Sequence, residues 1–219
     1  MAYQRTPYVE SKRAQARERL VAAALDLLKV GGWREVQMSA VAAAAGVSTG
    51  AIYLHFPSKS QLLSQVYRTQ AESELRVLAD IAAQDAPAAD RLAAALRAFA
   101  QRALANRPLG YAMVLEPAEI EVEEERLHFH SQYIEAFRGV LEAGRKAGEF
   151  EVADPQVAAA CIFGAAVESL IGPLGAGLHH RAPTREETQR LVESLVAFCL
   201  NGIGGAPPAR RAAGRKKRR

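Results

Sequence analysis

The residues best suited to chemistry in this chain are polar side chains on one short predicted helix. Thr49, Tyr53 and His55 follow an alanine run and a turn, and Lys59 comes soon after them. Hydroxyl, phenol, imidazole and ammonium groups can bond to base edges and to phosphate oxygens. Gly50 would let such a helix approach a groove with no side chain in the way. These residue types indicate a helix that reads DNA.

The surrounding elements form a helix-turn-helix pattern that starts at Met38. Ala42 falls where two helices must approach closely, and Gly46 falls where the turn needs a positive φ. Pro57 stops the second helix, and we expect Phe56 to lie in the core. An alanine-rich hairpin buried in a larger domain would share much of this pattern. A short, polar-faced helix between two defined breaks favours sequence-specific binding in the major groove.

The segment Ala45 to Lys59, AGVSTGAIYLHFPSK, is similar to the signature of the TetR family of bacterial transcriptional regulators. The helix from Arg19 to Leu28 and the following Gly-Gly-Trp resemble the family's first helix and its stop, so the motif similarity covers about residues 15–66. Two positions depart from the family: Gln37 replaces the usual Thr or Ser N-cap, and Ser60 replaces an acidic residue. Because Gln is a weaker N-cap, the start of the second helix is less defined than its end.

The resemblance implies roles for matched positions. Thr49 and Gly50 would face base edges, and Tyr53, His55 and Lys59 would hold phosphates. Packing within the small domain is the alternative for Tyr53 and His55. The complete set of expected DNA-binding residues is Gln37, Ser39, Ser48, Thr49, Gly50, Tyr53, His55 and Lys59.

Composition predicts a protein with a sizeable core and no membrane span. The chain has 219 residues, of which 49% are hydrophobic, enough for one domain or two small ones. We find no apolar run of about 18 residues and no signal peptide, so we expect a cytoplasmic location. Cys161 and Cys199 are too isolated for a disulfide framework or a zinc site, and we expect both to be reduced and buried.

Positive charge is concentrated at the two ends of the chain. Net charge is +4 over residues 1–59, −7 over residues 60–206 and +7 over residues 207–219. This distribution predicts nucleic-acid contact at the ends. A basic N-terminal arm could reach a minor groove, or it could be a frayed terminus. Its cations are Arg5, Lys12, Arg13 and Arg17. The tail from Arg210 to Arg219 would add non-specific affinity or only solubility.

The sequence predicts an all-α fold with an N-terminal three-helix DNA-binding domain, including the helix-turn-helix, and a larger helical domain for ligand binding and dimerisation. The expected boundaries are 1–57, 58–204 and a disordered basic tail over 205–219. Capping boxes are predicted at Ser58 with Gln61 and at Thr184 with Glu187. The expected helices cover residues 11–30, 38–45, 49–55, 59–83, a segment around 92–103, 109–115 and 118–147. The next begins at residue 155 and ends at a loop over 172–177, and the last begins after the capping box at Thr184 and ends at residue 201.

The last two helices carry apolar residues on more than one face, which suggests a homodimer. Leu191, Leu195 and Phe198 form one face of the final helix, and Ala158 and Ala165 mark small positions on the helix before it. Two such helices from each chain would form a four-helix interface, and a twofold dimer would read a pseudo-palindromic double-stranded DNA operator. The alternative is that both faces are used within the monomer.

An aromatic stripe on the helix over 118–147 predicts a small-molecule site. The family resemblance implies an effector that alters DNA affinity, and cavities between helices are common ligand sites. Plain core packing is the competing interpretation. The expected lining of a pocket for a small, largely apolar effector is Phe99, Tyr111, Met113, Phe129, Tyr133, Phe137 and Phe163.

Other patterns predict no cofactor, no metal site and no catalytic residues. Six glutamates between Glu116 and Glu125 are interpreted as a solvated face, and His128 and His130 point to different sides of a helix. His179 and His180 have no ligand partner nearby in sequence. We therefore expect no enzyme but a ligand-responsive repressor that binds its operator as a homodimer. The alternative is a DNA-binding protein with a structural or division-control role and no effector.

Overall fold

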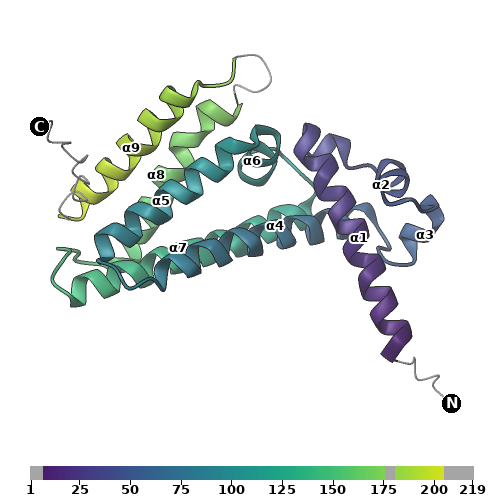
Figure 1. Cartoon of the computed structure of the whole chain (residues 1–219), viewed down its shortest axis with the longest axis horizontal. Helices are drawn as coiled ribbons and strands as arrows, with labels where there is room; N and C mark the ends of the chain where they lie inside the picture. The colour runs from purple at the N-terminus through teal and green to yellow at the C-terminus, as the bar shows by residue number, and fades with distance from the viewer. Residues whose placement is uncertain (1–6, 176–180, 205–219) are drawn as a thin grey trace, which may run out of the picture.

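The computed structural model describes residues 7–175 and 181–204, and every regular element in these ranges is a helix. We call residues 7–56 the head and residues 59–204 the body, which lie side by side in Figure 1. The head contains α1 (Pro7–Gly31), the 3-10 helix η1 (Trp33–Glu35), α2 (Met38–Ala45) and α3 (Thr49–Tyr53). The body contains α4 (Lys59–Ala82), α5 (Ala88–Ala105), α6 (Arg107–Val114), α7 (Ile120–Lys146), α8 (Pro155–Gly175) and α9 (Arg185–Gly202). The all-α expectation is confirmed.

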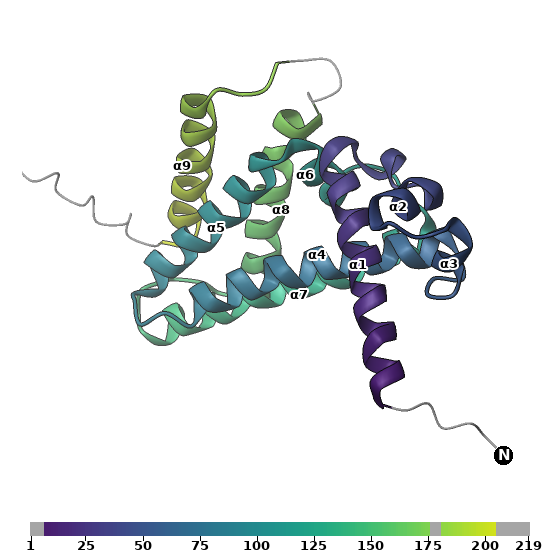
Figure 2. The same cartoon turned by 45° about the vertical axis from the view of Figure 1, so that its right-hand side comes forward.

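Helices α4 and α7 lie side by side and run in the same direction away from the head (Figure 1). Ser60 Oγ donates to Glu121 at 2.8 Å, and further along both helices Arg68 pairs with Glu125. Helix α5 returns toward the head, since Arg102 near its end bonds Glu74 of α4. Figure 2 shows α8 and α9 on the far side of the body from α3.

One continuous core runs from the head into the body. In the head it includes Leu28, Ile52 and Phe56, all fully buried, so the expected core position of Phe56 is confirmed. In the body it includes Leu92 and Leu170, which are also fully buried. Head and body therefore share packed side chains.

Most predicted helix ends are confirmed in detail. Gly46 has φ 69°, and its N–H donates to the Ala43 carbonyl while Val47 N–H donates to Ala42, a Schellman motif. Thr184 and Glu187 form both bonds of a capping box. Ser58 caps α4 by accepting from Gln61 N–H at 3.2 Å, but Gln61 returns no bond, so only half of that capping box exists.

Four expectations about the elements are wrong. The first helix starts at Pro7 and not at Ser11, because Pro fits the first helical turn. Helix α3 ends at Tyr53 and not at His55, since the chain then tightens into i→i+3 bonds before Pro57. Helix α8 continues through Gly172 to Gly175 with Pro173 in its last turn, where few backbone bonds are lost. Cys161 is exposed, while Cys199 is buried, which raises the pKa of its thiol to about 11.

By length and composition alone helix α8 could cross a membrane, but Glu168 and Ser169 interrupt its apolar sequence, so the expectation of no uninterrupted apolar run is not contradicted. Within the body one side of α8 packs against α5, α6, α7 and α9, and 33% of its apolar stretch is buried. The expectations for Arg5, His179, His180 and the tail over 205–219 lie outside the described residues.

Candidate DNA-binding head and effector cavity

Helix α3 presents a polar surface to solvent while its apolar side holds it to the head. Ile52 and the following Phe56 are fully buried, whereas Tyr53 is 50% exposed. Alternation of this kind fixes the helix and leaves its outer face free to contact a groove. The exposed residues among those predicted to bind DNA are Gln37, Ser39, Ser48, Thr49, Gly50 and Tyr53.

Two of these exposed side chains already serve the local backbone. Ser48 Oγ caps α3 by accepting from Ala51 N–H at 3.3 Å. Gln37 makes no capping bond and instead donates from Nε2 to the Arg34 carbonyl at 2.9 Å. The start of α2 therefore lacks the side-chain cap that Ser or Thr would supply, as its sequence predicts.

His55 lies outside α3 and turns back toward α1. It borders a small hollow with Ala16 and Leu20, and its Nδ1 is buried without a hydrogen-bond partner. Burial, followed by the positive charges of Arg13 and Arg17, lowers the pKa of His55. A neutral, partly buried imidazole is poorly suited to hold a phosphate, so the structure favours packing for this residue.

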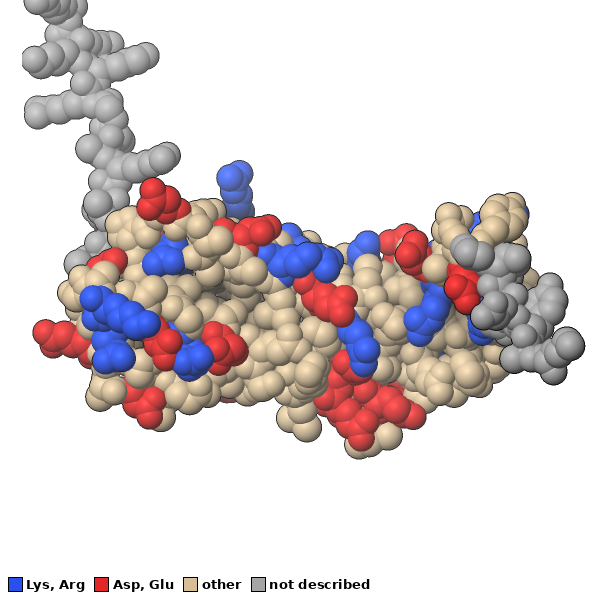
Figure 3. All heavy atoms as spheres, turned by 90° about the horizontal axis from the view of Figure 1, so that it is seen from below, with Lys and Arg blue, Asp and Glu red and all other residues tan. Residues whose placement is uncertain are grey.

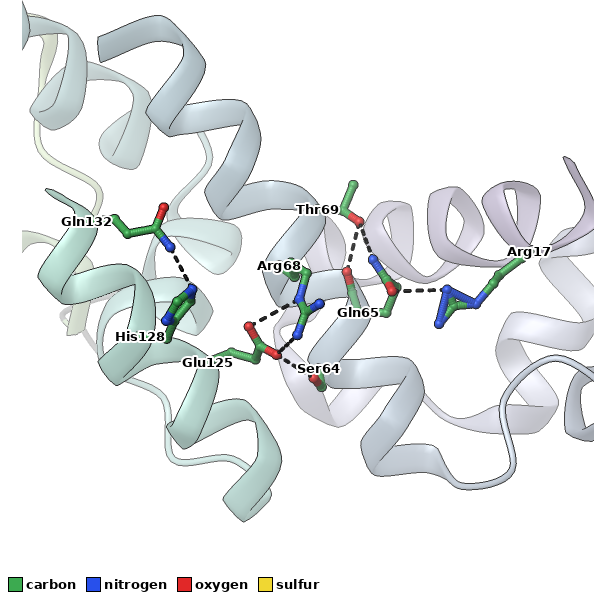
Figure 4. A network of polar contacts seen from close by, with 8 residues as sticks. All are labelled: Arg17, Ser64, Gln65, Arg68, Thr69, Glu125, His128 and Gln132. Carbon is green, nitrogen blue, oxygen red and sulfur yellow. Dashed lines mark hydrogen bonds and ion pairs between the residues drawn. The ribbon is translucent and has the colours of Figure 1, made fainter. Parts of the chain in front are cut away.

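The described part of the basic arm is helical and braces the end of α3. Arg13 Nη2 donates to the Leu54 carbonyl at 3.0 Å. Arg17 donates to Gln65 Oε1 at 3.0 Å, a bond drawn in Figure 4, and its guanidinium lies 4.5 Å from the centre of the Phe56 ring. A frayed terminus does not describe these residues, which connect α1 to the α3–α4 turn.

The acidic segment at the start of α7 attaches this helix to α4. Lys59 Nζ lies 3.3 Å from Glu119 Oε1, so this predicted phosphate contact is already paired. Glu125 is 9% exposed, and it accepts bonds from Arg68 and from Ser64 Oγ (Figure 4). The interpretation of the six glutamates as a solvated face is therefore wrong for most of them, since Glu119, Glu121 and Glu125 bond to α4, and only Glu124 is exposed.

Trp33 is the main link between head and body. Its indole Nε1 donates to the Ala112 carbonyl at 3.1 Å, and its backbone N–H donates to Glu116 Oε2 at 2.9 Å. The preceding Gly32 has φ 79°, and a Cβ there would collide with the Glu116 carboxylate. Only glycine therefore permits this approach of the head to the α6–α7 turn.

A cavity of about 120 Å³ lies within the body, between five helices. Aromatic rings form much of its wall: Tyr133 and Phe163 stack at 5.4 Å with 10° between their planes, and Phe99 meets both rings edge-on. The lining residues are Tyr67, Gln70, Glu74, Phe99, Arg102, Ala103, Leu109, Gly110, Met113, Val114, Arg126, His130, Tyr133, Phe163 and Val167.

The structure brings together four of the seven residues predicted for the pocket: Phe99, Met113, Tyr133 and Phe163. Phe129 instead packs on Tyr67 at 6.1 Å, and Phe137 is 1% exposed within the core. Tyr111 borders a different hollow, where α1 meets the α5–α6 turn. These three side chains do not line the cavity, because the cavity contacts only a narrow part of the apolar faces of α6 and α7.

Sequence reasoning missed the polar part of the lining: Gln70, Glu74, Arg102, Arg126 and His130. Arg126, His130 and Tyr133 recur at the spacing of one helix face. This periodicity is the sequence signal that could have identified Arg126 and His130 as lining residues.

Arg126 connects the cavity wall to the α6–α7 turn. It donates to the carbonyls of Ala112 at 3.1 Å, Met113 at 3.3 Å and Glu116 at 2.8 Å, and to Glu123 Oε2 at 2.5 Å. Burial raises the pKa of Tyr67 to about 12 and that of Tyr133 further. Both phenols therefore stay neutral and can donate hydrogen bonds.

The outward sides of α8 and α9 carry several apolar side chains, but these differ from the predicted ones, and the exposed side of α8 also carries Glu168. Leu195 is 6% exposed because it packs into its own chain, and Leu191, Ala158 and Ala165 are half-buried. Phe198 is 69% exposed as an interface residue would be. On α8 the outward stripe is rotated by one residue, and its members are Val157, Cys161, Gly164 and Ile171.

Charge on the body is mixed. On the face seen in Figure 3, basic and acidic residues are interspersed, and the largest single group is acidic. Within residues 7–175 and 181–204, no group of three His, Cys, Asp or Glu residues could hold a metal ion.

Comparison with known proteins connects both sites to one family. The sequence model of the tetR family of bacterial regulatory proteins matches residues 20–66, and that of the tetracyclin repressor-like C-terminal domain matches residues 85–170. A fatty acid metabolism regulator protein of Bacillus subtilis is 24% identical over 154 residues, which cover 69% of this chain and 79% of the relative.

Solved structures agree on the fold. The FadR regulator of Bacillus subtilis in complex with stearoyl-CoA superposes with a TM-score of 0.71 at 21% identity, covering 85% of this chain and 98% of that one. RolR in complex with resorcinol gives 0.61 at 21% identity, covering 90% and 91%. The two family models together match more than half of the sequence, and they place a DNA-binding helix-turn-helix domain before a ligand-binding domain. The chain is therefore a transcriptional regulator that belongs to the TetR family.

Proposed function

We propose that this TetR-family regulator is a repressor that binds a pseudo-palindromic operator as a homodimer and leaves it when a small molecule enters the cavity. The observation that carries this proposal is that one side chain, Arg126, both lines the cavity and bonds the turn to which Trp33 of the head is attached. A molecule bound in the cavity would therefore be linked to the head through the bonded contacts of Arg126 and Trp33.

The unpaired apolar face of α8 and α9 supports the homodimer. Val157 is 57% exposed, Ile171 38% and Phe198 69%, and the two helices that carry them lie on the far side of the body from α3 (Figure 2). Exposed apolar patches on a protein surface mark interaction sites, and we propose that these side chains belong to one. A twofold contact there would leave both α3 helices free to reach two half-sites.

The size and walls of the cavity support a small, largely apolar effector. Its 120 Å³ is close to the roughly 150 Å³ of an apolar cavity that binds benzene. The related structures hold different ligands, stearoyl-CoA in one and resorcinol in the other, so we carry neither identity over. What we propose from the cavity itself is an aromatic-sized or short aliphatic body.

The proposal is tested by mapping the genomic fragments that the purified full-length protein binds. We expect few sites, each an inverted repeat in a promoter, with half-sites one helical turn or a multiple apart. Loss of these fragments for Tyr53→Ala would link binding to α3. Many scattered sites without an inverted repeat would contradict the proposal and favour a structural or division-control role.

A further inference from the structure

We infer that the effector is a small organic acid, whose apolar body fills the aromatic cavity and whose carboxylate binds Arg126. This inference rests on the proposed function and names the ligand class of the same cavity. Three observations support it: the charge of the cavity lining, the hydrogen bonds of Arg126, and the link from the bonded segment to Trp33 of the head.

The lining carries one more positive charge than negative charge. Arg102 and Glu74 both line the cavity and form a two-bond ion pair, with N–O distances of 2.5 and 2.9 Å. Arg126 also lines it, but its acidic partner Glu123 is not part of the wall. A cavity with apolar walls and a net positive charge favours an anion over a neutral molecule of the same shape.

Arg126 is also well placed to exchange partners. Its guanidinium has five N–H donors, and four of its hydrogen bonds go to three carbonyls and to Glu123. A carboxylate prefers two parallel bonds from one guanidinium. A bound acid would therefore take at least one donor away from Glu123 or from the three carbonyls.

Those carbonyls belong to the segment that holds the head. The Ala112 carbonyl accepts from both Arg126 and the indole N–H of Trp33. Glu116 accepts from Arg126 through its carbonyl and from the Trp33 backbone through its carboxylate. An acid that draws Arg126 into the cavity would loosen this shared segment. The protein would then bind the acid with different affinity in two states that differ in the position of the head. Such a difference in affinity is what shifts an equilibrium between states.

The experiment compares acids with neutral molecules of the same shape. Phenylacetate with 2-phenylethanol, and hexanoate with hexan-1-ol, are titrated calorimetrically into the full chain. Each acid should bind at least about tenfold more tightly than its alcohol, the usual worth of a charge-assisted hydrogen bond. Arg126→Gln should lose this preference and keep alcohol binding, while Arg126→Lys should keep part of it. Arg138→Gln is the matched control, because Arg138 lies on the same helix and pairs with Glu135 and Glu142 outside the cavity wall.

A second measurement tests the route to the head. Trp33→Phe keeps the ring and removes the indole N–H, so it should bind phenylacetate normally while the acid releases less operator DNA. Equal affinity for acid and alcohol, or an unchanged preference for the acid in Arg126→Gln, would overturn the inference. Neither result would contradict the proposed function as a ligand-responsive repressor. No saturable binding of any of the four compounds would overturn the ligand class as well. Failure of the unliganded protein to bind operator DNA would instead count against the proposed function.

Discussion

At the scale of single residues, Tyr53 and Phe56 lie three positions apart and face opposite ways. Tyr53 is 50% exposed on the outer side of α3, whereas Phe56 is fully buried under the guanidinium of Arg17. Sequence spacing alone leaves both aromatic rings open to a core role. The structure separates them, and this makes them a matched pair for testing which side of α3 contacts DNA.

Tyr53→Ala should weaken operator binding about threefold to tenfold, as expected for the loss of one hydrogen bond to DNA. Its melting temperature should stay within about 2 °C of the wild type, because surface substitutions change stability little. Fluorescence anisotropy at fixed salt measures the affinity. Phe56→Ala should instead lose about 3 kcal/mol or more of stability. Unchanged affinity of Tyr53→Ala would show that this ring does not contact DNA.

His55 should make the stability of the head depend on pH. Its pKa in the folded chain is lowered from 6.5, chiefly by burial and then by Arg13 and Arg17. Between the lowered pKa and 6.5 the unfolded chain binds more protons, so the free energy of unfolding falls as the pH decreases through that window. His55→Gln should therefore lose less melting temperature than the wild type between about pH 7.5 and about pH 5.5. His128→Gln, at an exposed position on α7, should behave as the wild type does.

At the scale of elements, two glycines of the helix-turn-helix have different physical roles. Gly46 ends α2 with φ 69°, a conformation that other residues adopt at a cost. Gly50 lies inside α3, and a Cβ there would meet nothing within 4 Å. The backbone requires one glycine, and the other leaves space at the surface that we propose to face DNA.

Alanine at the two positions should therefore give opposite results. Gly46→Ala should cost about 1 kcal/mol, which lowers the melting temperature by roughly 2–4 °C. Gly50→Ala should keep or raise the melting temperature, since Ala favours helix by up to about 1 kcal/mol over Gly. Operator affinity of Gly50→Ala should fall if α3 approaches the groove at this point. A stable Gly50→Ala protein with full affinity would place Gly50 away from the bases.

Elements with strong local signals could be predicted from the sequence, and those set by tertiary contacts could not. The bounds of α2 follow from Met38 and Gly46, because helix ends depend on a few nearby bonds. The outward stripe of α8 could not be placed, since residues 157, 164 and 171 and their neighbours one position later are all aliphatic or glycine. Which set is buried depends on α7 and α5, far away in the chain. The ion pairs of the acidic segment were hidden for the same reason.

At the scale of the whole molecule, α4 connects the head to the cavity. Its first turn is held to α7 through Ser60 and Glu121, and its middle residues Tyr67, Gln70 and Glu74 line the cavity. Helix α1 packs on the same helix through Arg17 and Gln65. A shift of α7 or α6 against α4 is therefore transmitted to the head through bonded contacts.

The last prediction concerns the number of chains that must act together. Val157→Asp with Phe198→Asp should convert the proposed dimer to monomer, because two charges would be buried on the twofold face. Light scattering after size exclusion measures the mass, and anisotropy measures the affinity. Operator affinity should fall at least about a hundredfold, since two linked half-site contacts become one. Leu127→Asp is the control, because Leu127 is 73% exposed on α7 and outside this face.

If the double variant stays dimeric, a different surface joins the two chains. If the wild type is itself monomeric at micromolar concentration, each chain must bind DNA alone, and the paired half-sites lose their structural basis.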